Sequence, residues 1–140
     1  MTSSKILPDL QCSLLCEEVR QEINGNLILI GVLQGLPVAQ LPVTVSLLCL
    51  FNRWTAGYGQ FVETVRLVAP DQMTVLCQHE SRFSLQEVTR HAINVVMLRS
   101  LKFEVAGPYY VEVLVDDVMK IRYPLVIHLI PPPPKPPEAK

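Results

Sequence analysis

Cysteine and histidine are the residue types in this chain best suited to metal or redox chemistry. Two pairs stand close together, Cys12 with Cys16 and Cys77 with His79. On a strand, Cys12 and Cys16 share a face but lie roughly 13 Å apart at ~3.3 Å per residue, too far for one zinc ion or one disulfide. On a helix they would be neighbours. Cys77 and His79 would lie about 6–7 Å apart, but zinc needs a further ligand, and none stands near them in sequence. We predict no metal site and no cofactor.

Catalytic motifs are missing from the sequence. Three histidines could act as general bases: His79, His91 and His128. The GxSxG, HExxH, P-loop and GxGxxG patterns do not occur. A Cys-His pair assembled from distant residues would leave no local signature. The adjacent acids Asp116 and Asp117 could bind calcium, but without further oxygen ligands such pairs more often serve as turn residues. The sequence therefore indicates a protein that is not an enzyme.

One segment carries residue types found at binding sites. Residues 52–59 place Arg53, Trp54 and Tyr58 in a glycine-containing connection between two predicted strands. Aromatic and arginine side chains in a loop on a rigid sheet are enriched at binding hot spots. We take these three as the candidate binding residues. The alternative is that Trp54 completes a strand and caps the core.

Length and charge limit the class of protein. The chain has 140 residues, which suits one domain with a core of its own. Its formal net charge is −1, from 12 basic and 13 acidic residues. The basic residues are scattered, whereas nucleic acids and anionic membranes demand clusters of them. We predict that the chain does not bind nucleic acid.

The composition is apolar for a small domain. Hydrophobic residues make up 49% of the chain, charged residues only 18%, and the mean hydropathy is +0.30. A small domain cannot hide all of this surface by itself. We therefore expect a protein partner or self-association, although a Val- and Leu-rich core is the simpler explanation.

The sequence predicts a cytoplasmic protein with no membrane span. Pro8 and Asp9 fall where the apolar stretch of a signal peptide would run. Pro37 and Pro42 interrupt the apolar residues 27–51, which favours two strands and a turn over one membrane helix. All four cysteines lie in apolar runs and are expected to be free thiols.

Hydrophobic residues recur with a period of two along most of the chain, which is typical of strands. The pattern is clearest in residues 109–115 and 119–129, which the tight-turn residues Asp116 and Asp117 would join as a hairpin. A second turn is expected at residues 24–26. Further strands are expected at 10–18, 27–33, 43–51, 61–68, 73–78, 93–98 and 101–105. The sequence thus predicts an all-β fold, an antiparallel β-sandwich of about eight strands.

One segment departs from this period. Ser84 and Glu87 have the spacing of a capping box, with Ser at the N-cap and Glu at N3. This favours one short helix near residues 85–92, the alternative being a polar loop.

The domain boundaries follow from composition. We expect an N-terminal arm at residues 1–8, a single β-sandwich domain at 9–130 and a proline-rich disordered tail at 131–140. The tail matches the PxxP spacing of proline-recognition ligands. We favour a stiff tail without a partner, with a proline-recognition ligand as the alternative.

The order of these features resembles an uncharacterised bacterial family of small β-sandwich domains of unknown function. The likeness covers most of residues 9–130. It departs at Gln72 and Asp117, where turn glycines would be expected. The resemblance implies a fold and no activity. The segments that carry it are Leu27–Val32, Arg53–Trp54, Val65–Asp71, Leu101–Tyr109, Val113–Asp116 and Pro124–Val126.

Two functions from different classes remain. The leading hypothesis is a non-enzymatic protein-interaction or structural module that buries an apolar sheet face or pairs an edge strand with a partner. The alternative is a module for a small ligand, with carbohydrate as one candidate, which would stack on Trp54 and Tyr58.

Overall fold

The computed structural model describes residues 4–131 and holds nine strands in two sheets. No helix occurs in this part of the chain, so none could cross a membrane. Residues 132–140, which include most of the predicted proline-rich tail, lie outside the described residues. The strands are β1 (Asp9–Gln21), β2 (Leu27–Val32), β3 (Leu36–Val38), β4 (Val43–Thr55), β5 (Gly59–Val68), β6 (Val75–Leu85), β7 (His91–Phe103), β8 (Gly107–Val115) and β9 (Val118–Leu129).

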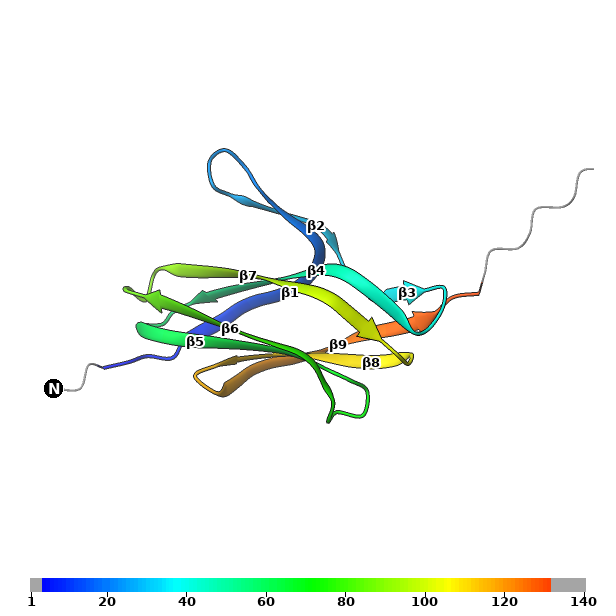
Figure 1. The fold of residues 1–140 in the computed structure, drawn as a ribbon. Coiled ribbons are helices and arrows are strands. Elements are labelled where there is room, and N and C mark those ends of the chain that lie inside the picture. Colours follow the sequence, from blue (N-terminus) through cyan, green and yellow to red (C-terminus); the bar gives the residue numbers. More distant parts are fainter. Residues whose placement is uncertain (1–3, 132–140) are drawn as a thin grey trace, which may run out of the picture.

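The two sheets pack face to face in a sandwich-like arrangement (Figure 1). Sheet 1 has the strand order β2-β1-β4-β7, and sheet 2 has the order β3-β9-β8-β5-β6. Alternate residues of both sheets point inward, as the period of two requires. They meet in one hydrophobic core, in which the rings of Phe103 and Tyr109 pack edge to face at 4.9 Å. The predicted all-β class is confirmed.

The prediction of one short helix near residues 85–92 is wrong. Ser84 and Leu85 are the last residues of β6 and pair with Gln60 and Gly59 of β5. A turn follows, in which the Arg90 amide donates to the Glu87 carbonyl at 3.1 Å. Long-range pairing with β5 therefore overrides the local capping signal, because tertiary context outweighs a weak intrinsic preference.

Two strand predictions also need correction. The short β3 was not expected, and it pairs in parallel with the end of β9, so sheet 2 is not purely antiparallel. Residues 93–98 and 101–105 were expected as separate strands, but 91–103 form the single strand β7. Ser100, three residues before the end of β7, has φ of 53°. This irregularity moves the inward positions from Val96 and Leu98 to Leu101 and Phe103.

The turn residues behave as their types suggest. Asp116 and Asp117 have φ of 47° and 64° and join β8 to β9 as predicted. Gln72, which stands where the resemblance led us to expect glycine, has φ of 64°. At Gln72 and Asp117, the two positions where the resemblance predicts glycine, the backbone thus adopts the conformation that favours glycine although neither residue is glycine.

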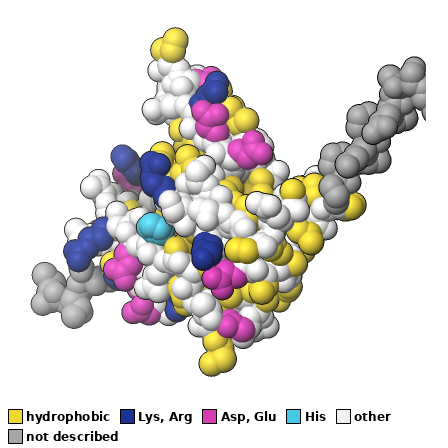
Figure 2. Space-filling view, turned by 45° about the vertical axis from the view of Figure 1, so that its right-hand side comes forward, with side chains coloured by type: hydrophobic (Ala, Val, Ile, Leu, Met, Phe, Trp, Pro, Cys, Tyr) yellow, Lys and Arg dark blue, Asp and Glu magenta, His cyan; other side chains and the backbone are white. Residues whose placement is uncertain are grey.

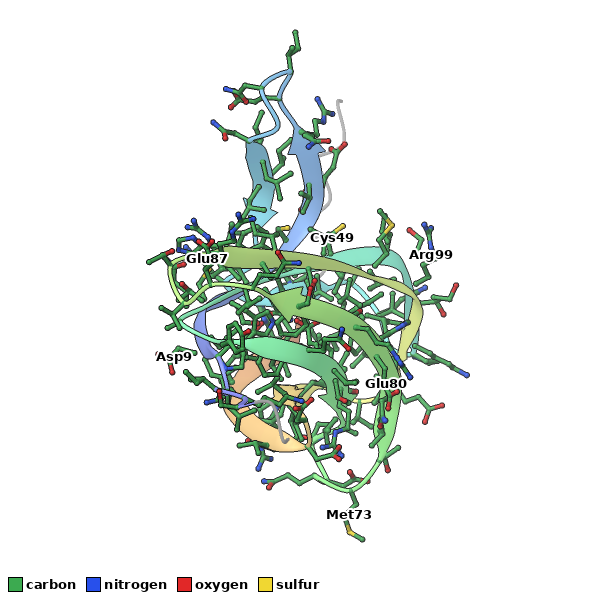
Figure 3. The ribbon with its side chains drawn as sticks, turned by 90° about the vertical axis from the view of Figure 1, so that its left-hand side faces the viewer. Asp9, Cys49, Met73, Glu80, Glu87 and Arg99 are labelled. Atoms are coloured by element: carbon green, nitrogen blue, oxygen red, sulfur yellow. The ribbon has the colours of Figure 1, made fainter. Side chains whose placement is uncertain are left out.

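The hairpin of β1 and β2 leaves the plane of sheet 1 and projects from the sandwich (Figures 1 and 3). We call this projection, residues 17–31, the finger. Gly31 lies at its base with φ of 70°, and a Cβ there would come within 2.8 Å of the Glu17 side chain. A residue other than glycine would therefore be both strained and obstructed where the hairpin bends.

A hydrogen bond closes one side of the sandwich. The hydroxyl groups of Ser13 in β1 and Tyr123 in β9 lie 2.9 Å apart and so join sheet 1 to sheet 2. Tyr123 is largely buried, and this desolvation raises the pKa of its phenol to about 12. The folded protein therefore holds the phenol proton more tightly than the unfolded chain does.

This difference predicts a loss of stability in alkali. The contribution of Tyr123 is fully present below about pH 10, the pKa of an unfolded tyrosine, and disappears as the pH rises toward about 12. We expect the unfolding free energy of the native protein to fall across this range, and that of Tyr123→Phe to fall less. The variant should also be about 1 kcal/mol less stable at neutral pH, since Ser13 loses its partner. Urea unfolding at a series of pH values measures both effects, and parallel pH profiles would contradict the prediction.

Candidate functional site

Trp54, a candidate binding residue, lies in the core of the sandwich. Its side chain is 0% exposed, and its ring stacks on Phe83 with centroids 5.5 Å apart. Its indole Nε1 donates a hydrogen bond of 2.6 Å to Oε2 of Glu63, which is also fully buried. Asn94 Nδ2 donates to the same oxygen at 3.0 Å. This arrangement matches the alternative interpretation, in which Trp54 belongs to the core, and its ring offers no surface to a ligand or partner.

The three candidate residues are not brought together. Arg53 and Trp54 are neighbours in β4, so their side chains point to opposite faces of sheet 1. Tyr58 lies exposed beyond the end of β4, where it forms a two-way backbone bridge with Ile6, each N–H···O bond measuring 2.9 Å. Each residue therefore belongs to a different part of the molecule.

Tyr58 borders a shallow polar hollow of about 410 Å³. Lys5, Gln60 and Gln86 also line it. The Lys5 ammonium is held by Asp116 at 2.6 Å and lies 4.9 Å from the Phe61 ring centroid. The hollow thus combines one exposed aromatic ring with several hydrogen-bonding side chains, the residue types that a sugar requires.

Arg53 borders a second hollow, which lies between the finger and the outer face of sheet 1. Its volume is about 350 Å³, and its apolar walls include Leu27 and Leu29 of the finger and Phe51 and Ile93 of the sheet. Within residues 4–131, the buried Nε of Arg53 has no hydrogen-bond partner. The hollow therefore combines apolar walls with the positively charged side chain of Arg53.

The outer face of sheet 1 is apolar beyond this hollow. Strand register places Leu14, Phe51 and Val95 in one row and Cys16, Cys49 and Met97 in the next. Phe51, Cys49 and Cys16 are buried although they point away from the core, because this part of the sheet lies at the base of the finger. Cys49 marks that base in Figure 3. Met97 and Ile93 are exposed beside it.

The outer face of sheet 2 is charged by contrast. Glu112 of β8 forms two ion pairs, one between its Oε1 and Nε of Arg66 in β5 at 3.5 Å and one between its Oε2 and Nε of Arg122 in β9 at 3.8 Å. The Arg122 guanidinium also lies 4.3 Å from the Tyr110 ring centroid. These charges form one cluster on this face, although Nε of Arg66 has no hydrogen-bond partner among the described residues. The outer face of sheet 2 is therefore more charged than that of sheet 1.

The thiols lie in protected surroundings. Cys16 and Cys49 face each other across β1 and β4, and burial, followed by the neighbouring Cys49, raises the pKa of the Cys16 thiol. Burial also raises the pKa of Cys77. A raised pKa leaves less of the reactive thiolate at neutral pH. The part of the chain that the structure describes holds no group of three metal-ligating side chains.

The sequence does not predict that the finger projects from the sandwich. Ile23 at its tip has a relative exposure of 109%, and Figure 2 shows an apolar side chain at the end of the projection with charged groups along it. The turn at Asn24 and Gly25 predicted the hairpin, but no local pattern shows that a hairpin leaves the plane of its sheet. The one available signal was the uncharged run Leu27–Val32.

Comparison with known proteins gives a family without a described role. The model of a family whose description reads "Family of unknown function (DUF6941)" matches residues 11–128. Curated protein sequences gave no match.

The two hydrogen bonds that Glu63 accepts from Trp54 and Asn94, which we call the polar bridge, predict a large effect of Glu63 on stability. Glu63→Ala removes the acceptor of Trp54 and Asn94 and leaves a cavity, so we expect a loss of about 3 kcal/mol in unfolding free energy. Glu63→Gln keeps an acceptor oxygen and should lose less, about 1 kcal/mol. Urea unfolding compares the two variants with the native protein. Near-native stability of Glu63→Ala would contradict a structural role for the bridge.

Proposed function

The chain belongs to the family DUF6941, whose function is unknown, and we propose that it is a non-enzymatic protein-interaction module. Its binding surface would comprise the finger and the apolar outer face of sheet 1. The non-enzymatic part of the proposal rests on the catalytic motifs missing from the sequence.

The exposed tip of the finger is the observation that carries the proposal. Ile23 stands in solvent beyond the last paired residues of the hairpin, where it can contribute nothing to the core. Burying an isoleucine side chain is worth about 1.5–3 kcal/mol. A second protein that covers the tip would gain this free energy, whereas a polar residue there would serve the isolated chain better.

The contrast between the two outer faces supports the same proposal. Sheet 2 carries a cluster of ion pairs around Glu112 on its outer face, while sheet 1 leaves Met97 and Ile93 exposed next to the finger. Contiguous apolar surface of this kind is typical of interaction sites. The finger and the sheet face adjoin, so one partner can cover both.

A small-ligand site beside Tyr58 is the second candidate, and the polar hollow there is the observation that favours it. A carbohydrate would stack on the Tyr58 ring and bond to Gln60 and Gln86. Trp54 takes no part in this version of the hypothesis, because it is buried.

The proposal predicts that one substitution at the tip of the finger abolishes binding of the protein partner. We expect Ile23→Asp to abolish retention of a stoichiometric protein partner in a tagged pull-down from host lysate, because it places a charge where an apolar contact is needed. Met73→Asp is the matched control, since Met73 is 85% exposed and lies at the opposite end of the molecule (Figure 3). Equal retention by both variants, or capture of the bait alone, would count against the proposal.

The hollow at Tyr58 predicts binding of a different kind. If it holds sugar, calorimetric titration with a panel of oligosaccharides should show binding that Tyr58→Ala abolishes. Tyr110→Ala, on the outer face of sheet 2, should leave such binding unchanged. No heat of binding from any oligosaccharide would remove this candidate.

A further inference from the structure

Strand β2 is an edge strand without the usual protection. It has a neighbour on one side only among the described strands, and its sequence, Leu27–Val32, contains no charged residue and no proline. Proteins ordinarily shield sheet edges with such residues or with very short strands, because an open apolar edge pairs with other chains. The residues that play this part on the other three edges are Pro37 in the short β3, Glu80 and Arg82 in β6, and Arg99 and Lys102 in β7.

The ladder between β1 and β2 shows which backbone groups this edge presents. At the tip, the Glu22 amide donates to the Asn26 carbonyl at 2.7 Å. Backbone groups of an antiparallel strand point alternately toward and away from the neighbouring strand. Ile28 lies two residues beyond Asn26 and faces Arg20, so it also directs its amide and carbonyl toward β1. Leu27 and Leu29 lie at the alternate positions and therefore direct their amides and carbonyls to the open edge.

We infer that this edge pairs with the same edge of a second copy of the chain, antiparallel and about a two-fold axis. Leu27 of each copy would bond to Leu29 of the other, and Ile28 would face its own symmetry mate on the axis. The inference rests on the proposed function, since it names what covers one side of the finger. An antiparallel strand pair is self-complementary, as a two-fold interface must be.

The position of the axis lets the two copies approach. Ile28 lies near the tip of the finger, which projects from the sandwich (Figure 3) and meets it across the hollow beside Arg53. Pairing centred there keeps the two sandwiches at opposite ends of the joined fingers. Ile28 is 41% exposed, so each copy would bury apolar surface that is open in the single chain.

The charges on the finger do not oppose this pairing. Glu17, Glu18, Arg20 and Glu22 all belong to β1 or to the turn, so none stands on the paired edge. The two β1 strands would lie three strand spacings apart, roughly 14 Å at about 4.8 Å each. This exceeds the Debye length of about 8 Å at physiological salt, so their repulsion is largely screened. One short strand gives a small interface, and the pair is expected to form in a concentration-dependent manner.

The test uses the fact that position 28 faces itself. Sedimentation velocity of the full chain over a wide concentration series should show a monomer–dimer equilibrium. Ile28→Lys and Ile28→Glu should each raise the dissociation constant by roughly tenfold or more, because like charges then stand directly opposite. An equimolar mixture of the two variants should restore the dimer, since Lys then faces Glu. Val118→Lys is the control, at a residue of similar exposure in β9, 44% against 41%.

A second readout locates the interface. Hydrogen exchange should show that the amides of Leu27 and Leu29 become protected as the concentration rises, and circular dichroism should show that the variants remain folded. A native protein that stays monomeric, a mixture that does not dimerise, or a dimer indifferent to position 28 would overturn the inference. If it fails while Ile23→Asp still loses a partner in the pull-down, the proposed function stands and the finger binds a different protein. If both fail, both proposals fall.

Discussion

Two hydrogen bonds from a row of polar side chains on the inner face of sheet 1 hold the two sheets in one arrangement. Register aligns Ser13, Asn52 and Asn94 across β1, β4 and β7. The hydroxyls of Ser13 and Tyr123 share a hydrogen bond, and Asn94 donates to Glu63, so both partners belong to sheet 2. The side chain of Asn52 has no hydrogen-bond partner among the described residues. Apolar contacts tolerate sliding, but buried polar groups require their own partners, so these bonds favour one alignment of the sheets.

The position of β1 determines where the finger stands, because its first half pairs with β4 inside the sandwich and its second half forms the finger. The base of the finger covers Cys16, Cys49 and Phe51, so that sheet 1 is locally buried on both faces. The hollow between the finger and sheet 1 brings Arg53 against apolar side chains from three strands. A rigid sandwich thus carries a projecting apolar hairpin, and the proposed interaction role depends on this combination rather than on any reactive group.

The candidate site was only partly predictable. Arg53, Trp54 and Tyr58 were grouped because they are close in sequence, but a strand sends successive side chains to opposite faces. Trp54 therefore entered the core, Arg53 faced the finger, and Tyr58 stayed at the surface. The projection of the finger could not be predicted, because its tip, Ile23, is an ordinary apolar residue whose exposure no neighbour in the sequence reveals.

The sequence by itself determined the all-β class, the hairpin at Asp116 and Asp117 and the turn at Gly25, because alternation and turn residues act over a few neighbouring positions. The tertiary structure decided what depends on distant partners. Pairing with β5 made Ser84 the end of a strand rather than a helix cap, and pairing with the end of β9 created β3. It also decided which apolar strand was left at an open edge, since only the assembled sheets show that β2 has one neighbour among the described strands.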